Sequence, residues 1–378
     1  MADMLVANGP RALLGKVAVM VSLVIASVSP AALAQATPAP PQPLAVDYSA
    51  PRAATLATYA KDFKLVGAVA VAFDGTHIWV ARSDTSDTSC SHCVTRISVD
   101  GKTATNFPLR SAAGVFAQSP IAIAFDGVNM WTANQGSNSV SRITPAGVVT
   151  HFTLPAGAQP MDIVFDGTNM WTANSGTHNV TRVTPTGVVT TFGGLPANSQ
   201  PMGIAFDGTN LWTANSRTNN VSRISVGSTV SVTNFPSGSN SSGPRAITFD
   251  GANLWTANNV DNVTKFDGTS GAATTIPLPG PCVASSAPNR CFPFGLAFDQ
   301  PGYSSAGNSD PSARYVWVGS SQATNRGNLM KIDTATNAVA ATYILPTGVM
   351  SSPRSMAFDG DNVWVVLAFN RVTRIRAR

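Results

Sequence analysis

The chain has 378 residues and a formal net charge of +5, and only 11% of its residues are charged, against about 25% in an average soluble domain. All 19 acidic residues are aspartates, which excludes any site that needs glutamate. The basic residues form no run, so nucleic acid is not expected as a partner.

The first 34 residues have the features of a cleavable secretory signal peptide. Arg11 and Lys16 give a positive start, residues 17–28 form an apolar run too short to span a bilayer, and residues 32–34 are an A-x-A cleavage site. An uncleaved anchor is the alternative. We therefore expect a periplasmic or secreted protein with no membrane span in its mature form.

Residues 35–53 are rich in Pro and Ala, which predicts an extended linker rather than part of a core. From residue 54 to residue 378, one motif is repeated seven times: Phe-Asp, usually Gly, two further residues, an apolar residue and Trp. The sixth copy is split by an insertion. The copies begin at Phe73, Phe125, Phe165, Phe206, Phe249, Phe298 and Phe358. A basic period near 40 residues with insertions predicts a repeat fold.

The block from Gln200 to Pro236 shows what one repeat forms. Short apolar runs alternate with turn residues, the first turn being Asp207-Gly208, and no helical pattern is present. Four antiparallel strands per repeat predict an all-β, seven-bladed β-propeller over residues 54–378. The last repeat has only three strands, so we expect residues 54–63 to complete the seventh blade and close the ring.

The repeat pattern P-x-G-I-A-F-D-G-x-N-L-W-x-x-N, followed by V-x-R-I, resembles NHL/YVTN-type bacterial propellers. In particular, it resembles the virginiamycin B lyase-like (streptogramin lyase-like) family. The resemblance covers about residues 54–378 and implies seven blades, but the matching residues are structural. The family's lyase uses magnesium with His and Glu residues in its late blades. Here the last histidine is His178 and Glu is absent, so those catalytic residues cannot be carried over.

Two residue types recur once in every repeat, an aspartate and a base. The aspartates are expected to cap the turn between the first two strands, a calcium site being the alternative. The bases are expected to pair with these aspartates, the alternative being a basic ring for polyanions. The aspartates are Asp74, Asp126, Asp166, Asp207, Asp250, Asp299 and Asp359, and the bases are Arg96, Arg142, Arg182, Arg223, Lys265, Lys331 and Arg374.

The seven tryptophans occupy one strand position in every repeat, which predicts a core between blades rather than a carbohydrate-stacking surface. The four cysteines lie in two insertions. For an exported chain we expect Cys90–Cys93 and Cys282–Cys291 disulfides, with cross-pairing as the alternative. A redox C-x-x-C or a zinc site with His92 remains open, but four zinc ligands are not visible.

The first residues of each first strand should line the central channel, and most are apolar. Three polar exceptions, Asp162, Arg245 and Arg354, are candidate ligand-binding residues, because Arg suits carboxylate or phosphate groups. His178 and Arg217, on neighbouring turns, are outer candidates.

These observations favour an exported, non-catalytic binding scaffold that acts through its loop-bearing rim. The partner would be an unknown protein or small molecule, the scaffold is expected to be a monomer, and no metal or cofactor is expected. The alternatives are a divergent lyase-like enzyme and a periplasmic nucleic-acid or polyanion binder. SMP-30-type lactonases resemble the fold too, but they need a metal site containing Glu, which this chain lacks.

Overall fold

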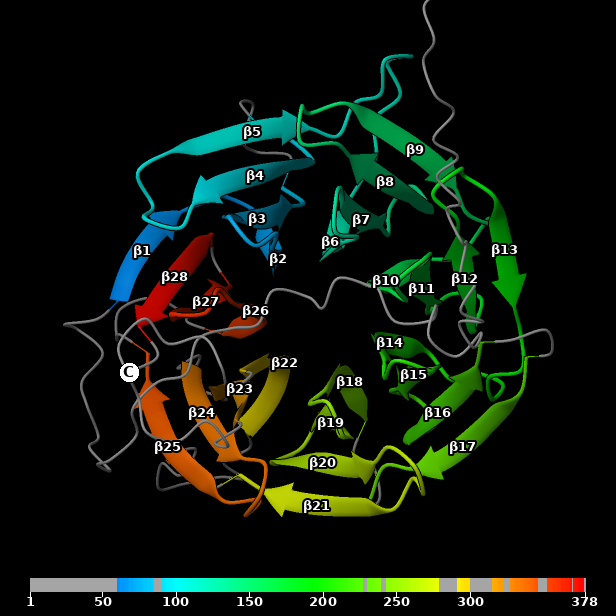
Figure 1. Cartoon of the computed structure of the whole chain (residues 1–378), viewed down its shortest axis with the longest axis vertical. Helices are drawn as coiled ribbons and strands as arrows, with labels where there is room; N and C mark the ends of the chain where they lie inside the picture. The colour runs from blue at the N-terminus through cyan, green and yellow to red at the C-terminus, as the bar shows by residue number, and fades with distance from the viewer. Residues whose placement is uncertain are drawn as a thin grey trace, which may run out of the picture. The chain divides into compact units, whose positions relative to one another are not determined.

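The computed structural model describes residues 60–84, 90–226, 230–238, 243–278, 291–299, 315–322, 327–345, 352–368 and 370–376. The predicted signal peptide (1–34) and linker (35–53) lie outside these residues. The described part of the chain forms seven four-stranded antiparallel sheets, arranged as the blades of a ring (Figure 1). The predicted all-β, seven-bladed propeller is confirmed. In the part of the chain described, no helix is long and apolar enough to cross a membrane.

Each of the first six blades consists of four consecutive strands. They are β2 (Ala68–Phe73), β3 (His77–Arg82), β4 (Cys93–Ser98) and β5 (Ala104–Pro108); β6 (Pro120–Phe125), β7 (Met130–Asn134), β8 (Ser139–Ile143) and β9 (Val149–Thr153); β10 (Pro160–Phe165), β11 (Met170–Asn174), β12 (Asn179–Val183) and β13 (Val189–Phe192); β14 (Pro201–Phe206), β15 (Asn210–Asn215), β16 (Asn220–Ser225) and β17 (Val232–Pro236); β18 (Pro244–Phe249), β19 (Asn253–Asn258), β20 (Asn262–Asp267) and β21 (Ala273–Pro277); β22 (Cys291–Asp299), β23 (Tyr315–Gln322), β24 (Gly327–Asp333) and β25 (Val339–Ile344).

The seventh blade joins the two ends of the propeller. It contains β26 (Pro353–Phe358), β27 (Asn362–Leu367) and β28 (Arg371–Arg376), and its outermost strand is β1 (Ala60–Lys64). Asp62 on β1 accepts hydrogen bonds from Arg371 Nη1 at 3.0 Å and Thr373 Oγ1 at 2.6 Å. The predicted ring closure is therefore confirmed by the strand at residues 60–64; residues 54–59 of the predicted strand lie outside the described residues.

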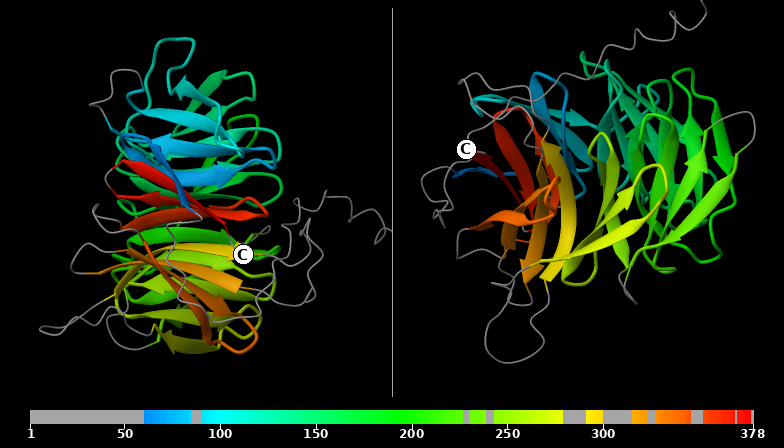
Figure 2. Two further views of the ribbon diagram at one scale, coloured as in Figure 1. Left: turned by 90° about the vertical axis from the view of Figure 1, so that its left-hand side faces the viewer. Right: turned by 60° about the horizontal axis from the view of Figure 1, so that its bottom comes forward.

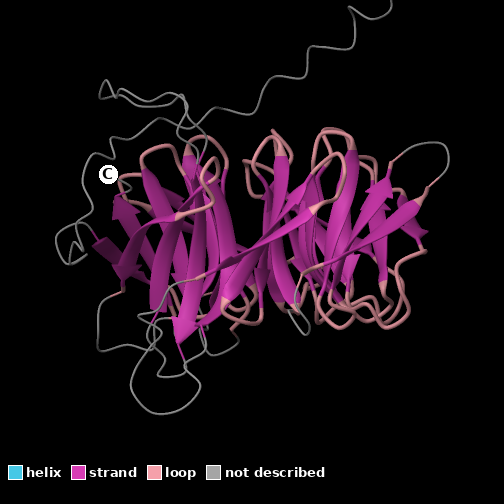
Figure 3. Cartoon of the chain, turned by 90° about the horizontal axis from the view of Figure 1, so that it is seen from below, coloured by secondary structure: helices cyan, strands magenta, loops and turns pink. Residues whose placement is uncertain are grey.

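The first strand of each blade lies nearest the centre, and the turns gather on the two faces of the ring (Figures 2 and 3). Since the strands alternate in direction, the turns after the first and third strands share one face. The turns after the second strands and the links between blades share the other, which we call the link face. Each first strand begins at the link face.

The core is made of seven apolar clusters, each formed between two neighbouring blades. Trp131 of the second blade, for example, packs with Ile163 and Met170 of the third. The other six tryptophans have the same place in their clusters, and every one of the seven is at most 2% exposed: Trp79, Trp131, Trp171, Trp212, Trp255, Trp317 and Trp364. The predicted core between blades is confirmed.

The repeated aspartates hold the turn after the first strand in the six blades in which that turn is described. Asp126 Oδ1 accepts hydrogen bonds from the backbone N–H groups of Val128 and Asn129, at 2.8 and 2.5 Å. Its Oδ2 accepts a third from Trp131 Nε1 at 2.6 Å. The aspartate–indole bond recurs in all seven blades at 2.6–2.9 Å. The aspartates therefore cap their turns as predicted, and they also fix the indoles.

The predicted pairing of these aspartates with the repeated bases is wrong for six of the bases. Arg142 stacks on the rings of Trp131 and Phe152, with its Cζ 5.8 Å from each centroid, and Nη1 donates to the backbone carbonyl of Pro185 in the next blade at 2.8 Å. Arg96, Arg223, Lys265 and Arg374 make the same kind of bond to a carbonyl of the following blade. Arg182 stacks likewise but has no such bond. The carboxylate oxygens of the aspartates already accept N–H groups. These six bases therefore stack on the aromatic rings of their own blade and, except for Arg182, donate to a backbone carbonyl of the next blade.

Candidate functional site

Seven β-bulges build the wall of the central channel. In each first strand one residue has no partner on the second strand, and the pairing register shifts around it; it is the second residue in six of the strands and the fourth, Phe294, in β22. A bulge re-aims a side chain out of the regular pleat. We call these seven residues the channel collar: Val69, Ile121, Met161, Met202, Arg245, Phe294 and Arg354. In six of the seven first strands, the residue directly before the bulge is Pro. This Pro is the sequence signal for the bulge.

The collar surrounds a cavity of about 410 Å³. Most of the wall is aliphatic or contains Met, and Asp162, Arg245 and Arg354 all line it. The structure therefore brings together three of the five candidate residues at one place. Polar atoms nevertheless make up more of the exposed wall than apolar atoms do. A cavity of this size with a few convergent polar groups suits a small molecule.

Arg245 is the most unusual member of the collar. Its Cζ lies 5.1 Å from the centroid of the Phe294 ring on the next blade, so the guanidinium stacks on an aromatic face. Its Nε is buried and has no hydrogen-bond partner. Burial lowers the pKa of the guanidinium, although a guanidinium stays charged in proteins. Arg354, two blades further on, is exposed at the same cavity.

Asp162 links two blades across the channel wall. Its Oδ1 accepts the backbone N–H of Ile163 and its Oδ2 accepts that of Ile204 in the next blade, both at 2.9 Å. Burial raises the pKa of this carboxyl to about 6, against the lowering effect of the two N–H groups. Ser355 does the same in the seventh blade, where its Oγ accepts the N–H of Val71 at 3.2 Å. Asp162 thus lines the cavity and also joins two blades by hydrogen bonds. The sequence did not predict this second role.

The other two candidates lie outside the cavity. His178 sits in a left-handed turn with φ 55°, and its Nδ1 accepts the backbone N–H of Gln200 in the next blade at 3.3 Å. Asn138, Asn219 and Asn370 bridge neighbouring blades in the same way from equivalent turns. Arg217 is exposed on the link face and does not line the cavity. His178 therefore has a structural contact, whereas the Arg217 side chain makes no hydrogen bond or ion pair with another described residue.

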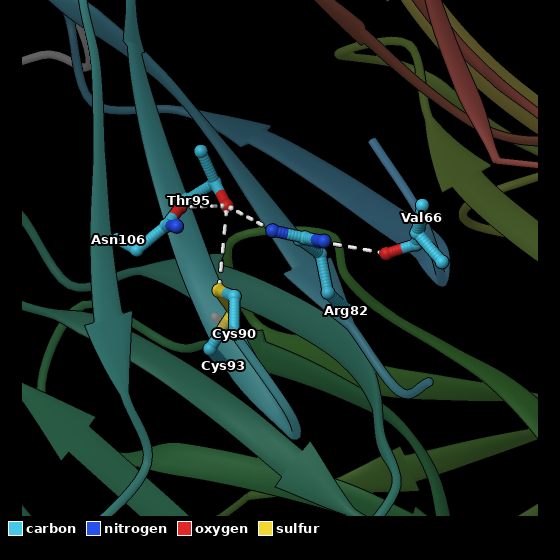
Figure 4. Close-up of a disulfide and its surroundings, with 6 residues drawn as sticks. All are labelled: Val66, Arg82, Cys90, Cys93, Thr95 and Asn106. Atoms are coloured by element: carbon cyan, nitrogen blue, oxygen red, sulfur yellow. Dashed lines mark hydrogen bonds between the residues drawn. A yellow bond between two sulfur atoms is a disulfide. The ribbon is translucent and has the colours of Figure 1, made fainter. Parts of the chain in front are cut away.

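Cys90 and Cys93 form a disulfide on the link face, with their Cα atoms 5.4 Å apart (Figure 4). Beside it, the largely buried Arg82 donates from Nε to the carbonyl of Val66 at 2.7 Å and from Nη1 to Thr95 Oγ1 at 3.4 Å. Arg82 holds the strand position at which blades two to five have a buried Asn, so disulfide and arginine replace the asparagine network of those blades. Cys282 and the side chain of Cys291 lie outside the described residues.

The magnesium site implied by the family resemblance does not fit the side chains of the channel. Within the described residues, no group of three or more His, Cys, Asp or Glu side chains is placed to hold a metal ion. Asp162 is the one carboxylate among the described residues of the cavity wall, and both its oxygens already accept N–H groups. Magnesium prefers oxygen ligands in near-octahedral geometry, and two arginines at the same cavity oppose a cation.

Comparison with known proteins agrees with this fold. Residues 116–302 match the model of the Virginiamycin B lyase family. None of the curated proteins compared with the chain matches it.

Three solved structures illustrate the likeness. A selenomethionine-substituted virginiamycin B lyase from Staphylococcus aureus has 20% identity and a TM-score of 0.66, over 84% of this chain and 99% of that one. A streptogramin B lyase has 17% identity and a TM-score of 0.62, over 84% and 97%. The U3-55K structure has 12% identity and a TM-score of 0.64, over 86% and 100%. At these identities the likenesses show the fold alone. The chain is therefore a seven-bladed β-propeller that matches the Virginiamycin B lyase family over residues 116–302 and is similar in fold to the lyases themselves.

Proposed function

We propose that this propeller is a non-catalytic binding protein whose central channel takes a small anionic ligand with an apolar body. The observation that carries the proposal is Arg245, which stacks on Phe294 and keeps a buried Nε without a partner at a cavity of about 410 Å³. A planar guanidinium in such a setting favours a carboxylate or phosphate group.

The aliphatic and Met residues of the cavity wall indicate what the uncharged part of the ligand should be. Ile121, Met161 and Met202 present aliphatic and thioether surface to the cavity. Such surface favours an aliphatic or aromatic body, and Met adapts to irregular shapes. Arg354 adds a second positive charge at the same cavity, so a dianion or a phosphate would gain more than a single carboxylate.

A divergent lyase-like enzyme is the second candidate, favoured by the family match over residues 116–302. Ring-opening elimination needs a base near the substrate, and the chain has no Glu and no His after His178. Asp162 is the carboxylate nearest to that role, but it accepts two backbone N–H groups. We therefore place binding ahead of catalysis.

The test is thermal shift followed by calorimetry on the mature chain. The panel contains amphipathic carboxylates and phosphates, streptogramins, oligosaccharides and short DNA, each with and without EDTA. A ligand that binds only the folded state raises the melting temperature by mass action. We expect the amphipathic anions to do so, whether or not a chelator is present.

The matched variants are Arg245→Ala, Arg354→Ala and, as a control on the same face, Arg217→Ala. We expect the two channel variants to lose at least tenfold in affinity and the control to bind as the parent does. Equal binding by all three would refute the channel as the site, and chelator-sensitive turnover of a streptogramin would establish the enzyme instead. Steeply salt-dependent binding of DNA would favour the polyanion alternative.

We further propose that the protein is exported and monomeric. Support comes from the signal-like residues 1–34 and the disulfide between Cys90 and Cys93. N-terminal sequencing of the protein recovered from the periplasm or medium should start at Gln35. Light scattering should give the mass of a single chain.

A further inference from the structure

The link between the first and second blades carries an insertion. Eleven residues join β5 to β6, whereas six join β9 to β10 and eight join β13 to β14. The backbone N–H of Ala117 donates to the carbonyl of Leu109 at 2.9 Å, which closes a small hairpin. We call the residues between them, 110–116, the hairpin tip. Its Val115 and Phe116 side chains are more than half exposed.

One histidine holds this tip against the second blade. On β9, His151 Nε2 lies 3.1 Å from the carbonyl oxygen of Val115, and its Nδ1 lies 2.8 Å from Ser141 Oγ on β8. Among the residues that the structure describes, this is the one hydrogen bond between the hairpin tip and the second blade. A carbonyl only accepts, so Nε2 carries the hydrogen and Nδ1 accepts from the Ser141 hydroxyl. The neutral imidazole therefore fits both partners.

The second blade is the one blade with histidine at this strand position. The residues that pair with the same position of the third strand in the other blades are Asn106, Thr191, Asn234, Thr275, Thr342 and Asp62. In the first and fourth blades, the Asn accepts the hydroxyl of Thr95 or Ser222 at 2.9 and 2.6 Å. Histidine keeps this bond through Nδ1 and adds the bond to the hairpin tip through its second nitrogen.

The groups behind His151 leave no place for a second ring hydrogen. Ser141 Oγ accepts from Asn134 Nδ2 at 2.8 Å, and Asn134 Oδ1 accepts from Thr132 Oγ1 at 2.9 Å. These three side chains are fully buried. A hydrogen on Nδ1 would make Ser141 accept from both sides and leave its own hydroxyl hydrogen without the acceptor it now has. An unsatisfied buried donor is costly.

No carboxylate of the described elements around His151 would offset a positive charge. The nearest charged residues along these elements are Arg110 of the hairpin tip and Arg142 of β8, and residues 101–125 and 127–161 contain no Asp. At the base of the hairpin, the carbonyl of His92 accepts the N–H of Leu109, and the carbonyl of Asp84 accepts the N–H of His92.

The protonation of His151 is disfavoured for these reasons. Burial lowers the pKa of its imidazole from the usual 6.5, against the raising effect of the carbonyls of Val115 and Leu109. A released hairpin tip would leave the imidazole in water with its usual pKa, so release is coupled to the uptake of a proton. Docking is therefore complete above pH 6.5 and weakens as the pH falls below it.

We propose that the hairpin tip is a pH-sensitive latch, docked on the second blade while His151 is neutral and released when His151 is protonated. The latch depends on no ligand, so it stands or falls independently of the channel.

The test is hydrogen exchange of the full mature chain, read by mass spectrometry at about pH 7.5 and about pH 5.5 and corrected for intrinsic rates. Peptides that cover residues 109–119 should lose protection by about threefold or more at the lower pH, with a limit of about tenfold for one proton. His151→Asn, the residue of the first and fourth blades, should show low protection that is equal at both pH values. The matched controls His92→Asn and His178→Asn should keep the pH dependence of the parent.

An NMR titration of the imidazole, assigned with His151→Asn, gives the second measurement and should yield a pKa below 6.5. A pKa of 6.5 or higher would overturn the proposal. So would equal protection of residues 109–119 at both pH values, or a His151→Asn variant with the pH dependence of the parent. A parallel loss of protection in β6 to β9 would show opening of the whole blade and would overturn it as well.

Discussion

The carboxylate of Asp162 in the third blade accepts the backbone N–H of Ile204 in the fourth at 2.9 Å. This bond joins the two innermost strands at the wall of the channel, where an edge strand has no further strand to pair with. A charged group that ties two blades together in a buried place makes the stability of the ring depend on pH.

Stability should fall between about pH 4 and pH 6 through Asp162. Burial raises the pKa of this carboxyl to about 6 from 3.8, so in this window the unfolded chain ionises while the folded chain keeps the proton. The loss is complete above about pH 6 and amounts to at most about 3 kcal/mol, since one pKa unit corresponds to about 1.4 kcal/mol. Chemical denaturation of the parent and of Asp162→Asn at several pH values isolates this contribution. Parallel profiles for the two proteins would contradict the assignment.

Replacing Arg142 should destabilise the propeller more than replacing Arg182. Both side chains stack on a Trp and a Phe, but only Arg142 donates to a carbonyl of the next blade, at 2.8 Å. We expect Arg142→Gln to cost about 1 kcal/mol more than Arg182→Gln in the free energy of unfolding, the ordinary worth of one such bond. Urea denaturation measures both. Equal losses would mean that stacking alone explains the conserved geometry of the junctions.

Asp126 and Trp131 should be energetically coupled through the aspartate–indole hydrogen bond. Trp131 Nε1 donates to Asp126 Oδ2 at 2.6 Å, and the indole is buried between blades. Trp131→Phe is expected to cost about 3 kcal/mol, through lost ring volume and an acceptor left without its donor. A double-mutant cycle with Asp126→Asn should give a coupling of about 1 kcal/mol or more. Additive losses would show that the aspartate acts only on its own turn.

His178 should be replaceable by Asn but not by Ala. Its Nδ1 accepts the N–H of Gln200 from a turn with φ 55°, and Asn138 and Asn219 make the same bridge with φ 47° and 52°. Asn tolerates the left-handed conformation and keeps an acceptor, so His178→Asn should be nearly neutral. His178→Ala should lose about 1 kcal/mol. A ligand-binding role would instead show as lost affinity with unchanged melting temperature in both variants.

Features that repeat along the chain were predictable from the sequence. The spacing of the Phe-Asp-Gly motifs predicted seven blades, and a last repeat one strand short predicted that β1 would complete it. The positions of Asp162, Arg245 and Arg354 at the channel followed because first strands line the centre. These predictions need only local pattern and topology.

Contacts between repeats were not predictable in the same way. Equal numbers of aspartates and bases suggested ion pairs, yet each partner of Arg142 is an aromatic ring of its own blade or a carbonyl of the next. Arg182 stacks on Trp171 and Phe192 but its Nε is buried without a hydrogen-bond partner, although its position in the repeat is the same as that of Arg142. Nor does the sequence indicate that His178 faces a backbone N–H, because its turn conformation sets that direction.

The seam of the ring has a mechanical consequence. β1 and β28 are antiparallel, and Ala60 lies opposite Ile375 while Lys64 lies opposite Arg371. Tension applied through residues 60 and 376 would therefore pull at the same end of the two strands and open their five residue pairs one after another, as a zipper opens, rather than loading them all at once. The bonds of Asp62 to Arg371 and Thr373 lie further along the zipper and would resist only after the first pairs had parted. Held at residues 60 and 376, the ring would therefore open at this seam under low force.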